Sequence, residues 1–114
     1  MQISIITAVF NRADTLTQTI QSVQSQTYPD IEHVIQDGGS TDGSLAVIDR
    51  LATGRASIES APDGGIYDAI NKGIARANGD VIGLLHSDDF LASDTTIAAV
   101  AAAFADPQID GVYG

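Results

Sequence analysis

The stretch Gly79–Asp89 has the sequence GDVIGLLHSDD, in which an apolar run, Val81–Leu85, lies between Gly79 and two adjacent acids. A short run of this kind predicts a strand that is buried on both faces, as in the interior of a parallel sheet. Ligands of open α/β sheets bind outside the carboxyl ends of the strands. We therefore expect the acids at positions 88 and 89 to lie at a ligand-binding edge.

The pair Asp88-Asp89 has two interpretations. Adjacent carboxylates repel each other and are costly to desolvate, so a nearby divalent cation would stabilise them. Pairs of aspartates are also common in turns, and by itself the pair favours metal binding only about evenly. His86 is either a further ligand or a hydrogen-bonding neighbour of the pair.

Composition excludes several classes of protein. A chain of 114 residues with 44% apolar residues is long enough for one domain with one core. The net charge of −10 argues against binding to nucleic acid or to anionic lipid. Cysteine is absent, which excludes disulfide and thiol chemistry. Because there is neither a bilayer-spanning apolar run nor a leader, we expect a cytoplasmic location, peripheral to a membrane at most.

Apolar segments alternate with stretches of helical spacing along the whole chain. Strands are predicted at 3–10, 31–36, 56–60 and 81–85, and a fifth opens at Val112-Tyr113. Helices are predicted between them, the fourth from Ser93 through Phe104. The order β-α-β-α-β-α-β-α-β predicts an α/β fold with a mainly parallel sheet, right-handed crossovers and helices on both faces.

Several side chains receive local roles from this pattern. Asn11 is predicted to cap the first helix, and Ile66, Ile70 and Ile74 are predicted to form the apolar stripe of the third. His33 is predicted to lie on the surface of the second strand. The basic residues of the third helix, Lys72 and Arg76, either approach phosphates or are solvated, and solvation is the default.

The polar residues gather in the loops after the first, second and fourth strands. These loops are 7–11, 37–44 and 86–89, and parallel strands would bring all three to one edge of the sheet. For Asp37, the roles of turn residue and of ligand-binding carboxylate are equally favoured. For Asp42, the role of helix cap is favoured over ligand binding. The second loop is neither a Walker P-loop nor a dinucleotide-binding GxGxxG motif.

Five segments resemble the N-terminal, nucleotide-sugar-binding half of family 2 glycosyltransferases, which have the GT-A fold. In order they are SIITAVFN (4–11), QTYPDIE (26–32), DGGSTDG (37–43), PDGGIYDAINKGI (62–74) and GD followed by LHSDD (79–80 and 85–89). The resemblance covers essentially the whole chain. It implies a Rossmann-like three-layer sandwich, with residues 1–114 as a single donor domain from a longer enzyme. The stretch GIYDAINKG (65–73) in the fourth segment resembles the bacterial subgroup that builds exopolysaccharide, capsule or lipopolysaccharide.

The resemblance also implies roles for individual residues. The segment Thr7–Asn11 matches the lining of the nucleotide pocket, and Asp37 matches the carboxylate that bonds the base. Asp88 matches the carboxylate that contacts Mg²⁺ or Mn²⁺ on the diphosphate. The donor-binding residues implied are Thr7, Ala8, Phe10, Asn11, Asp37, Asp68, Asn71, Lys72 and Ser87, and the metal ligands are Asp88, His86 and Asp89.

Two departures from the family pattern limit what the resemblance implies. His86 stands where the family's Asp-x-Asp motif has its first aspartate, and no residue matches the catalytic base, which lies in the family's second half. We therefore expect an inverting transferase donor domain that binds a UDP- or GDP-sugar and serves a glycan or lipid-linked acceptor. The alternative is a truncated, non-catalytic α/β module that binds nucleotide weakly or self-associates as a homodimer through an unpaired sheet edge at Val112-Tyr113. A sugar nucleotidyltransferase is disfavoured, because the Gly-rich signature of that class is absent after Ile6.

Overall fold

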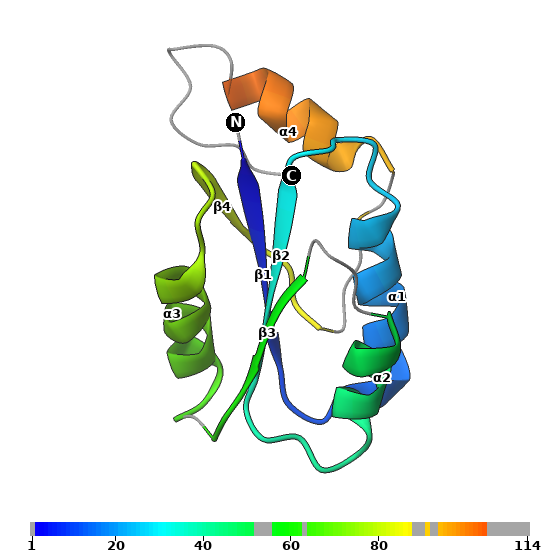
Figure 1. The fold of residues 1–114 in the computed structure, drawn as a ribbon, viewed down its shortest axis with the longest axis vertical. Helices are drawn as coiled ribbons and strands as arrows, with labels where there is room; N and C mark the ends of the chain where they lie inside the picture. Colours follow the sequence, from blue (N-terminus) through cyan, green and yellow to red (C-terminus); the bar gives the residue numbers. More distant parts are fainter. Residues whose placement is uncertain (1, 52–55, 63, 88–90, 92–93, 105–114) are drawn as a thin grey trace.

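The computed structural model describes residues 2–51, 56–62, 64–87, 91 and 94–104. Strands and helices alternate through these residues, as the sequence predicts (Figure 1). The elements are β1 (Ile3–Val9), α1 (Ala13–Gln24), β2 (Ile31–Asp37), α2 (Ser44–Leu51), β3 (Ala56–Ser60), α3 (Ile66–Arg76), β4 (Val81–Leu84) and α4 (Thr96–Phe104). The fifth strand expected at Val112-Tyr113 lies outside the described residues.

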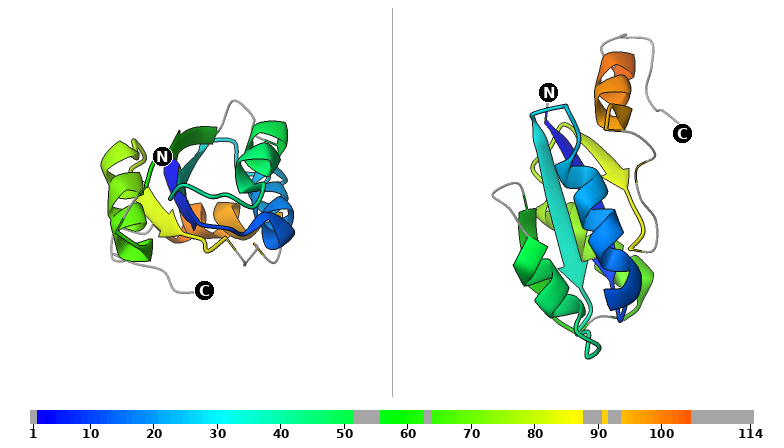
Figure 2. Two further views of the ribbon diagram at one scale, coloured as in Figure 1. Left: turned by 90° about the horizontal axis from the view of Figure 1, so that it is seen from below. Right: turned by 90° about the vertical axis from the view of Figure 1, so that its right-hand side faces the viewer.

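The four strands form one parallel sheet in the order β3-β2-β1-β4. Ile3 in β1 pairs with Ile31 on one side and with Val81 on the other, so β1 is central although it comes first in the chain. Helices cover both faces: α3 lies on one side of the sheet and α1 and α2 on the other (Figure 2). The predicted mainly parallel α/β architecture is confirmed.

The core lies between the sheet and the helices on the α1 side. One apolar cluster joins the sheet to α1 and α4: Ile3, Ile5, Val23, Ile31, Leu85, Ile97 and Ala101. A second joins it to α1 and α2: Val9, Leu16, Ile20, Ile35 and Ile48. In α1, Leu16, Ile20 and Val23 recur at the helical spacing that predicted this helix, and all three are buried.

Helix α3 packs against β1 through its small residues rather than through its isoleucines. A Cβ atom at Gly73 would lie 2.6 Å from Ile6 Cγ2, so only glycine permits this approach. Ala69 is buried beside it, whereas Ile66 is 50% and Ile74 40% exposed. The predicted helix is therefore confirmed, but its buried face is the one that carries Ala69 and Gly73.

The strand β4 is not buried on both faces, as the apolar run had predicted. It lies at the edge of the described sheet, and Ile82 is 44% and Leu84 55% exposed. Ile82 pairs with Ser4 and Leu84 with Ile6 of β1, so both side chains lie on the same face of the sheet as Ile6. Helix α3 packs on this face, but its main contacts are with β1 and β2. We call Ile66, Ile74, Ile82 and Leu84 the open corner.

Two polar residues predicted at the surface take part in internal contacts. His33 is 3% exposed, its Nε2 atom lies 2.8 Å from Thr7 Oγ1, and burial lowers its pKa to about 4. Arg76 donates from Nη2 to the Ile35 carbonyl at 2.9 Å and from Nη1 to Ser57 Oγ at 2.8 Å. Neither residue is the solvated side chain that the sequence suggested. None of the helices in the described part of the chain is long and apolar enough to cross a membrane.

Candidate nucleotide-binding site

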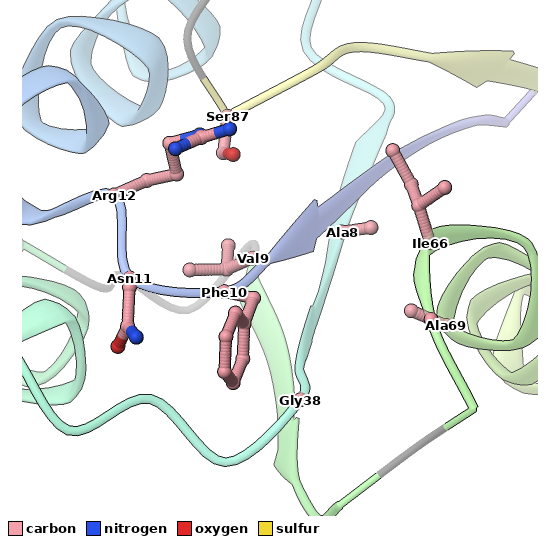
Figure 3. Close-up of a pocket in the computed structure, with 10 residues that line it drawn as sticks. Ala8, Val9, Phe10, Asn11, Arg12, Gly38, Ile66, Ala69 and Ser87 are labelled. Atoms are coloured by element: carbon pink, nitrogen blue, oxygen red, sulfur yellow. The ribbon is translucent and has the colours of Figure 1, made fainter.

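A cavity of about 570 Å³ opens at the carboxyl ends of the strands (Figure 3). Its walls come from the end of β1 and the loop after it, the residue after β2, the start of α3 and the loop after β4. The lining residues are Ala8, Val9, Phe10, Asn11, Arg12, Gly38, Gly65, Ile66, Ala69 and Ser87. Four segments that are distant in the sequence therefore meet at the edge where the sequence predicts a ligand site.

The cavity brings together four of the residues predicted to bind a donor: Ala8, Phe10, Asn11 and Ser87. The ring of Phe10 is 58% exposed and stands at the cavity, as Figure 3 shows. Val9 belongs to the segment 7–11 that the resemblance places in the pocket lining, and the other lining residues were not named as donor-binding residues. Most of them are glycine or small apolar residues, for which sequence patterns give no functional signal.

Arg12 is the important omission from the predicted site. Among the described residues it is the one positively charged side chain that lines the cavity, in a chain with 15 acids and only 5 bases. Figure 3 shows its side chain extending along the cavity in the direction of Ser87. Its position directly after the predicted pocket segment, in so acidic a sequence, was the signal that could have identified it.

The backbone around Asn11 is joined to the loop after β2 by reciprocal hydrogen bonds. The Asn11 N–H donates to Ser40 Oγ at 2.9 Å, and the Thr41 N–H donates to Asn11 Oδ1 at 2.8 Å. Asn11 has a φ of 53°, a left-handed conformation that asparagine tolerates better than most residues. The predicted capping role is wrong, because Arg12 holds the N-cap position and Asn11 bridges two loops instead.

Asp42 continues this junction to the starts of two helices. Its Oδ1 accepts from the Ser44 N–H at 3.0 Å and the Ser44 hydroxyl at 2.6 Å, and its Oδ2 accepts from the Ala13 N–H at 3.1 Å. The hydrogen bond from the Ser44 hydroxyl is the largest cause of the lowered pKa of Asp42. The predicted cap is confirmed and serves α1 as well as α2. We call residues 11–13 together with 40–44 the loop clamp.

Asp37 anchors the loop clamp from beneath. Its carboxylate is 0% exposed, and Oδ2 accepts from the Gly39 and Ser40 N–H groups at 2.9 Å each and from Ser60 Oγ at 2.8 Å. Ser40 Oγ donates to Oδ1 at 2.5 Å. This geometry gives Asp37 the turn-forming role that the sequence left open, and its contact with a base stays a prediction.

The remaining donor-binding predictions fall outside the cavity lining. Thr7 is 0% exposed and bonded to His33 within the sheet. Asp68 accepts from the Gly64 N–H at 2.8 Å and pairs with Lys72 at 3.3 Å, and the backbone bond is the first cause of its lowered pKa. Asn71 is exposed on α3. Asp68 and Lys72 thus hold the loop before α3, and their donor contacts stay predictions.

The predicted metal ligands follow Ser87 directly. Ser87 is 6% exposed, and its carbonyl oxygen accepts from Thr15 Oγ1 at 2.9 Å and Thr19 Oγ1 at 3.1 Å. His86 is exposed, whereas Asp88 and Asp89 lie outside the described residues. Among the residues that are described, no group of three or more histidines and acids could hold a metal ion. The metal site therefore stays a prediction.

Comparison with known proteins agrees with this architecture. An uncharacterized glycosyltransferase of Mycobacterium tuberculosis is 42% identical over 114 residues, which are 98% of this chain and 44% of that protein. A PGL/p-HBAD biosynthesis glycosyltransferase of Mycobacterium bovis is 38% identical over 115 residues, covering 97% of this chain and 45% of the relative. The chain thus spans less than half the length of these relatives.

Solved structures show the same fold at lower identity. TarS 1–349 of S. aureus in complex with UDP-GlcNAc matches with a TM-score of 0.86 at 23% identity, over 93% of this chain and 32% of that one. The mannosyltransferase PcManGT of Pyrobaculum calidifontis, in complex with GDP-Man and Mn²⁺, matches with a TM-score of 0.84 at 23% identity, over 95% of this chain and 33% of that one. The GT-A fold expected from the resemblance is confirmed.

The family model described as "Glycosyl transferase family 2" matches residues 4–114. That match takes in the elements of the described fold except Ile3, the first residue of β1, and it includes every segment that lines the cavity. The chain therefore belongs to glycosyl transferase family 2.

Proposed function

We propose that this chain binds the nucleoside diphosphate part of a nucleotide sugar in the cavity at the carboxyl edge of the sheet. The observation that carries the proposal is the meeting of an exposed aromatic ring, Phe10, and a guanidinium group, Arg12, in one cavity of about 570 Å³. Aromatic rings stack on bases, and guanidinium groups bind phosphates. The volume is in the range of small-molecule sites.

The bound nucleotide is a UDP-sugar in this proposal, with a GDP-sugar as the alternative. The resemblance of the sequence favours uridine, and the solved relatives include one complex with UDP-GlcNAc and one with GDP-Man. Both ligands are diphosphates. The positive charge of Arg12 would suit either one, while the surface as a whole, with its net charge of −10, would repel them.

A divalent cation, Mg²⁺ or Mn²⁺, completes the proposed site. Asp88 is the principal ligand, with His86 and Asp89 beside it. The donor set fits by its chemistry, because carboxylate oxygens suit these cations and the two acids follow the cavity residue Ser87 directly. When bound, the cation would neutralise charge on the diphosphate. The role of this chain's own residues is to orient that diphosphate.

The whole enzyme, in this proposal, is an inverting glycosyltransferase of cell-surface polysaccharide synthesis, of which residues 1–114 are the donor domain. A base would deprotonate an acceptor hydroxyl on a glycan or lipid-linked acceptor, and the oxygen would attack the anomeric carbon in a single displacement. No residue of this chain is assigned as that base. The expected cytoplasmic location remains a prediction.

Calorimetric titration of UDP and of GDP tests the proposal. We expect one of them to bind in the presence of Mn²⁺ and to lose most of its affinity in EDTA. Asp88→Ala should abolish the metal dependence, and a variant that kept it would remove Asp88 from the site. Failure of the unaltered chain to bind either nucleotide would contradict the proposal.

Arg12→Gln sharpens this test. We expect it to weaken nucleotide binding about tenfold, because one charge-assisted bond to phosphate is lost. The matched control is Arg50→Gln: Arg50 is exposed on α2, does not line the cavity, and its loss changes the net charge equally. Equal weakening by both variants would indicate a general charge effect rather than a contact in the cavity.

The open corner favours a second candidate, self-association of two copies. Within the described residues β4 pairs with β1 alone, and Ile82 and Leu84 stand beside its free edge. Two such edges can pair in antiparallel fashion and bury the apolar residues of both copies. Each copy carries a net charge of −10, so repulsion should oppose the dimer and salt should strengthen it.

Light scattering at low and high salt tests this candidate. We expect a dimer fraction that rises with salt and is lost in Leu84→Lys, which adds a charge to the pairing surface. A monomer at all salt concentrations would exclude the dimer. A dimer that persists in Leu84→Lys would place the contact elsewhere.

A further inference from the structure

Four polar residues form a stripe along α1 and just past its end. Thr15, Thr19, Ser22 and Gln26 recur at alternating spacings of four and three residues, so they share one face of the helix. Polar side chains in a buried position normally reduce stability unless each has a hydrogen-bond partner. Thr19 is 0% and Gln26 4% exposed, so the partners of this stripe need an explanation.

The first two members of the stripe bind the wall of the cavity. Thr15 Oγ1 and Thr19 Oγ1 both donate to the carbonyl oxygen of Ser87, at 2.9 Å and 3.1 Å. Ser87 lines the cavity and is the last described residue before the acid pair. Two donors that converge on one acceptor fix the orientation of that peptide group better than apolar packing, which is non-directional.

The other two members bind the chain further along the connection between β4 and α4. The Leu91 N–H donates to Ser22 Oγ at 3.0 Å, and the Ile97 N–H donates to Gln26 Oε1 at 2.9 Å. Both acceptors are themselves oriented, since Ser22 Oγ donates to the Thr19 carbonyl at 2.8 Å and Gln26 Nε2 donates to the Ser22 carbonyl at 2.9 Å. The stripe therefore bonds described residues on both sides of this connection and within it: Ser87, Leu91 and Ile97.

We propose that this stripe is a positioning device: α1 fixes Ser87, Leu91 and Ile97 by hydrogen bonds and thereby holds Ser87 in the wall of the cavity. Thr15 and Thr19 are then positioning residues for nucleotide binding, although neither lines the cavity. The inference rests on the proposed function for its ligand. The geometric part, the dependence of the connection on α1, can be tested without any ligand.

The ligand-free test is amide hydrogen exchange in Ser22→Ala. The Leu91 amide loses its acceptor in this variant, and we expect it to exchange about tenfold faster, the equivalent of one hydrogen bond. The amide of Val34 in the central sheet is the internal reference and should keep its rate. An unchanged rate at Leu91 would contradict the positioning role of the stripe.

The ligand test compares Thr19→Val, which keeps the shape but loses the hydroxyl, with Thr19→Ser, which keeps the hydroxyl. We expect UDP to bind about tenfold more weakly to the valine variant and within about twofold of the unaltered chain to the serine variant. Thr17→Val, at a half-buried position of the same helix, is the control and should bind normally.

The possible results separate the two proposals. If the unaltered chain binds no nucleotide, the proposed function fails, and the exchange experiment alone decides on the stripe. If it binds and both Thr19 variants bind equally well, the positioning inference fails while the proposed function stands. If both variants weaken binding to the same extent, the methyl group and not the hydroxyl matters, which also contradicts the inference.

Discussion

The loop clamp and the open corner are two regions of the molecule that are built in opposite ways. In the loop clamp, backbone N–H groups of the loops find side-chain acceptors within the clamp, such as Ser40 Oγ and Asn11 Oδ1. In the open corner, Ile82 and Leu84 remain half-exposed beside a sheet edge. The clamp is satisfied by its own contacts, whereas the corner has the properties of a surface that pairs with something else.

This difference has a practical consequence. A self-contained polar junction should respond strongly to substitution in the isolated chain, because every removed acceptor leaves a donor without a partner. An exposed apolar surface should respond weakly until its partner is present. The following three predictions test this contrast, from the largest effect to the smallest.

Asp37→Ala should destabilise the chain most. The substitution removes the acceptor for two backbone N–H groups and two hydroxyls, all at a site that is 0% exposed. We expect a loss of about 4 kcal/mol in the free energy of unfolding, measured by urea titration. Asp49→Ala, at an exposed position of α2, is the control and should change stability little. Similar losses in the two variants would mean that the hydrogen bonds of Asp37 do not contribute to the free energy of unfolding.

Lowering the pH should weaken the sheet beneath the clamp through His33. Burial lowers the pKa of His33 to about 4 in the folded chain, from 6.5 for the free side chain. The unfolded chain therefore binds a proton at His33 more readily than the folded chain does. The folded state has its full stability with respect to this group above pH 6.5, and it loses stability as the pH falls toward 4. The expected loss over this window is about 3 kcal/mol.

The measurement compares the pH dependence of unfolding in the unaltered chain and in His33→Gln. Carboxylates titrate in both proteins, so the difference between the two curves isolates the histidine. We expect the unaltered chain to lose more stability between pH 6.5 and 4. Parallel curves would show that His33 has an ordinary pKa and is accessible to water.

The double substitution Ile82→Ser with Leu84→Ser should lower the free energy of unfolding of a monomer by only about 1 kcal/mol per residue, because both side chains are already half-exposed. Leu16→Ala is the buried reference, since Leu16 is 0% exposed, and it should lose about 3 kcal/mol. Urea unfolding at low protein concentration measures both. If the double variant lost as much per substituted residue as Leu16→Ala, the open corner would be part of the core after all.

The alternation of elements was predictable because apolar periodicity is a local property. Leu16, Ile20 and Val23 specify both the helix and its buried face. The same reasoning failed for α3, where Ile66 and Ile74 gave the period but Gly73 decided which face packs, because a close approach to Ile6 outweighs the burial of larger side chains. It also failed for β4, since an apolar run does not reveal whether a helix will cover both faces of the strand.

The candidate site was predictable as a location more than as a set of contacts. Parallel strands bring their following loops to one edge, which correctly placed Phe10, Asn11 and Ser87. The pairing of Asn11 with Ser40 and Thr41 depends on distances between loops that are far apart in the sequence, and no local pattern encodes it. Arg12 was missed for a related reason. The direction of its exposed side chain depends on the left-handed turn at Asn11, which the sequence did not predict.

The central position of β1 also sets the order in which this molecule can mature. Ile3 pairs with Val81, and the Gln2 N–H bonds Asp80 at 3.0 Å, so contacts that complete the sheet join the start of the chain to residues that a ribosome adds much later. Contacts so distant in sequence are slow to form. The part of the cavity that contains Ser87 should therefore form last, and the chain should bind a ligand only after β4 has paired with β1.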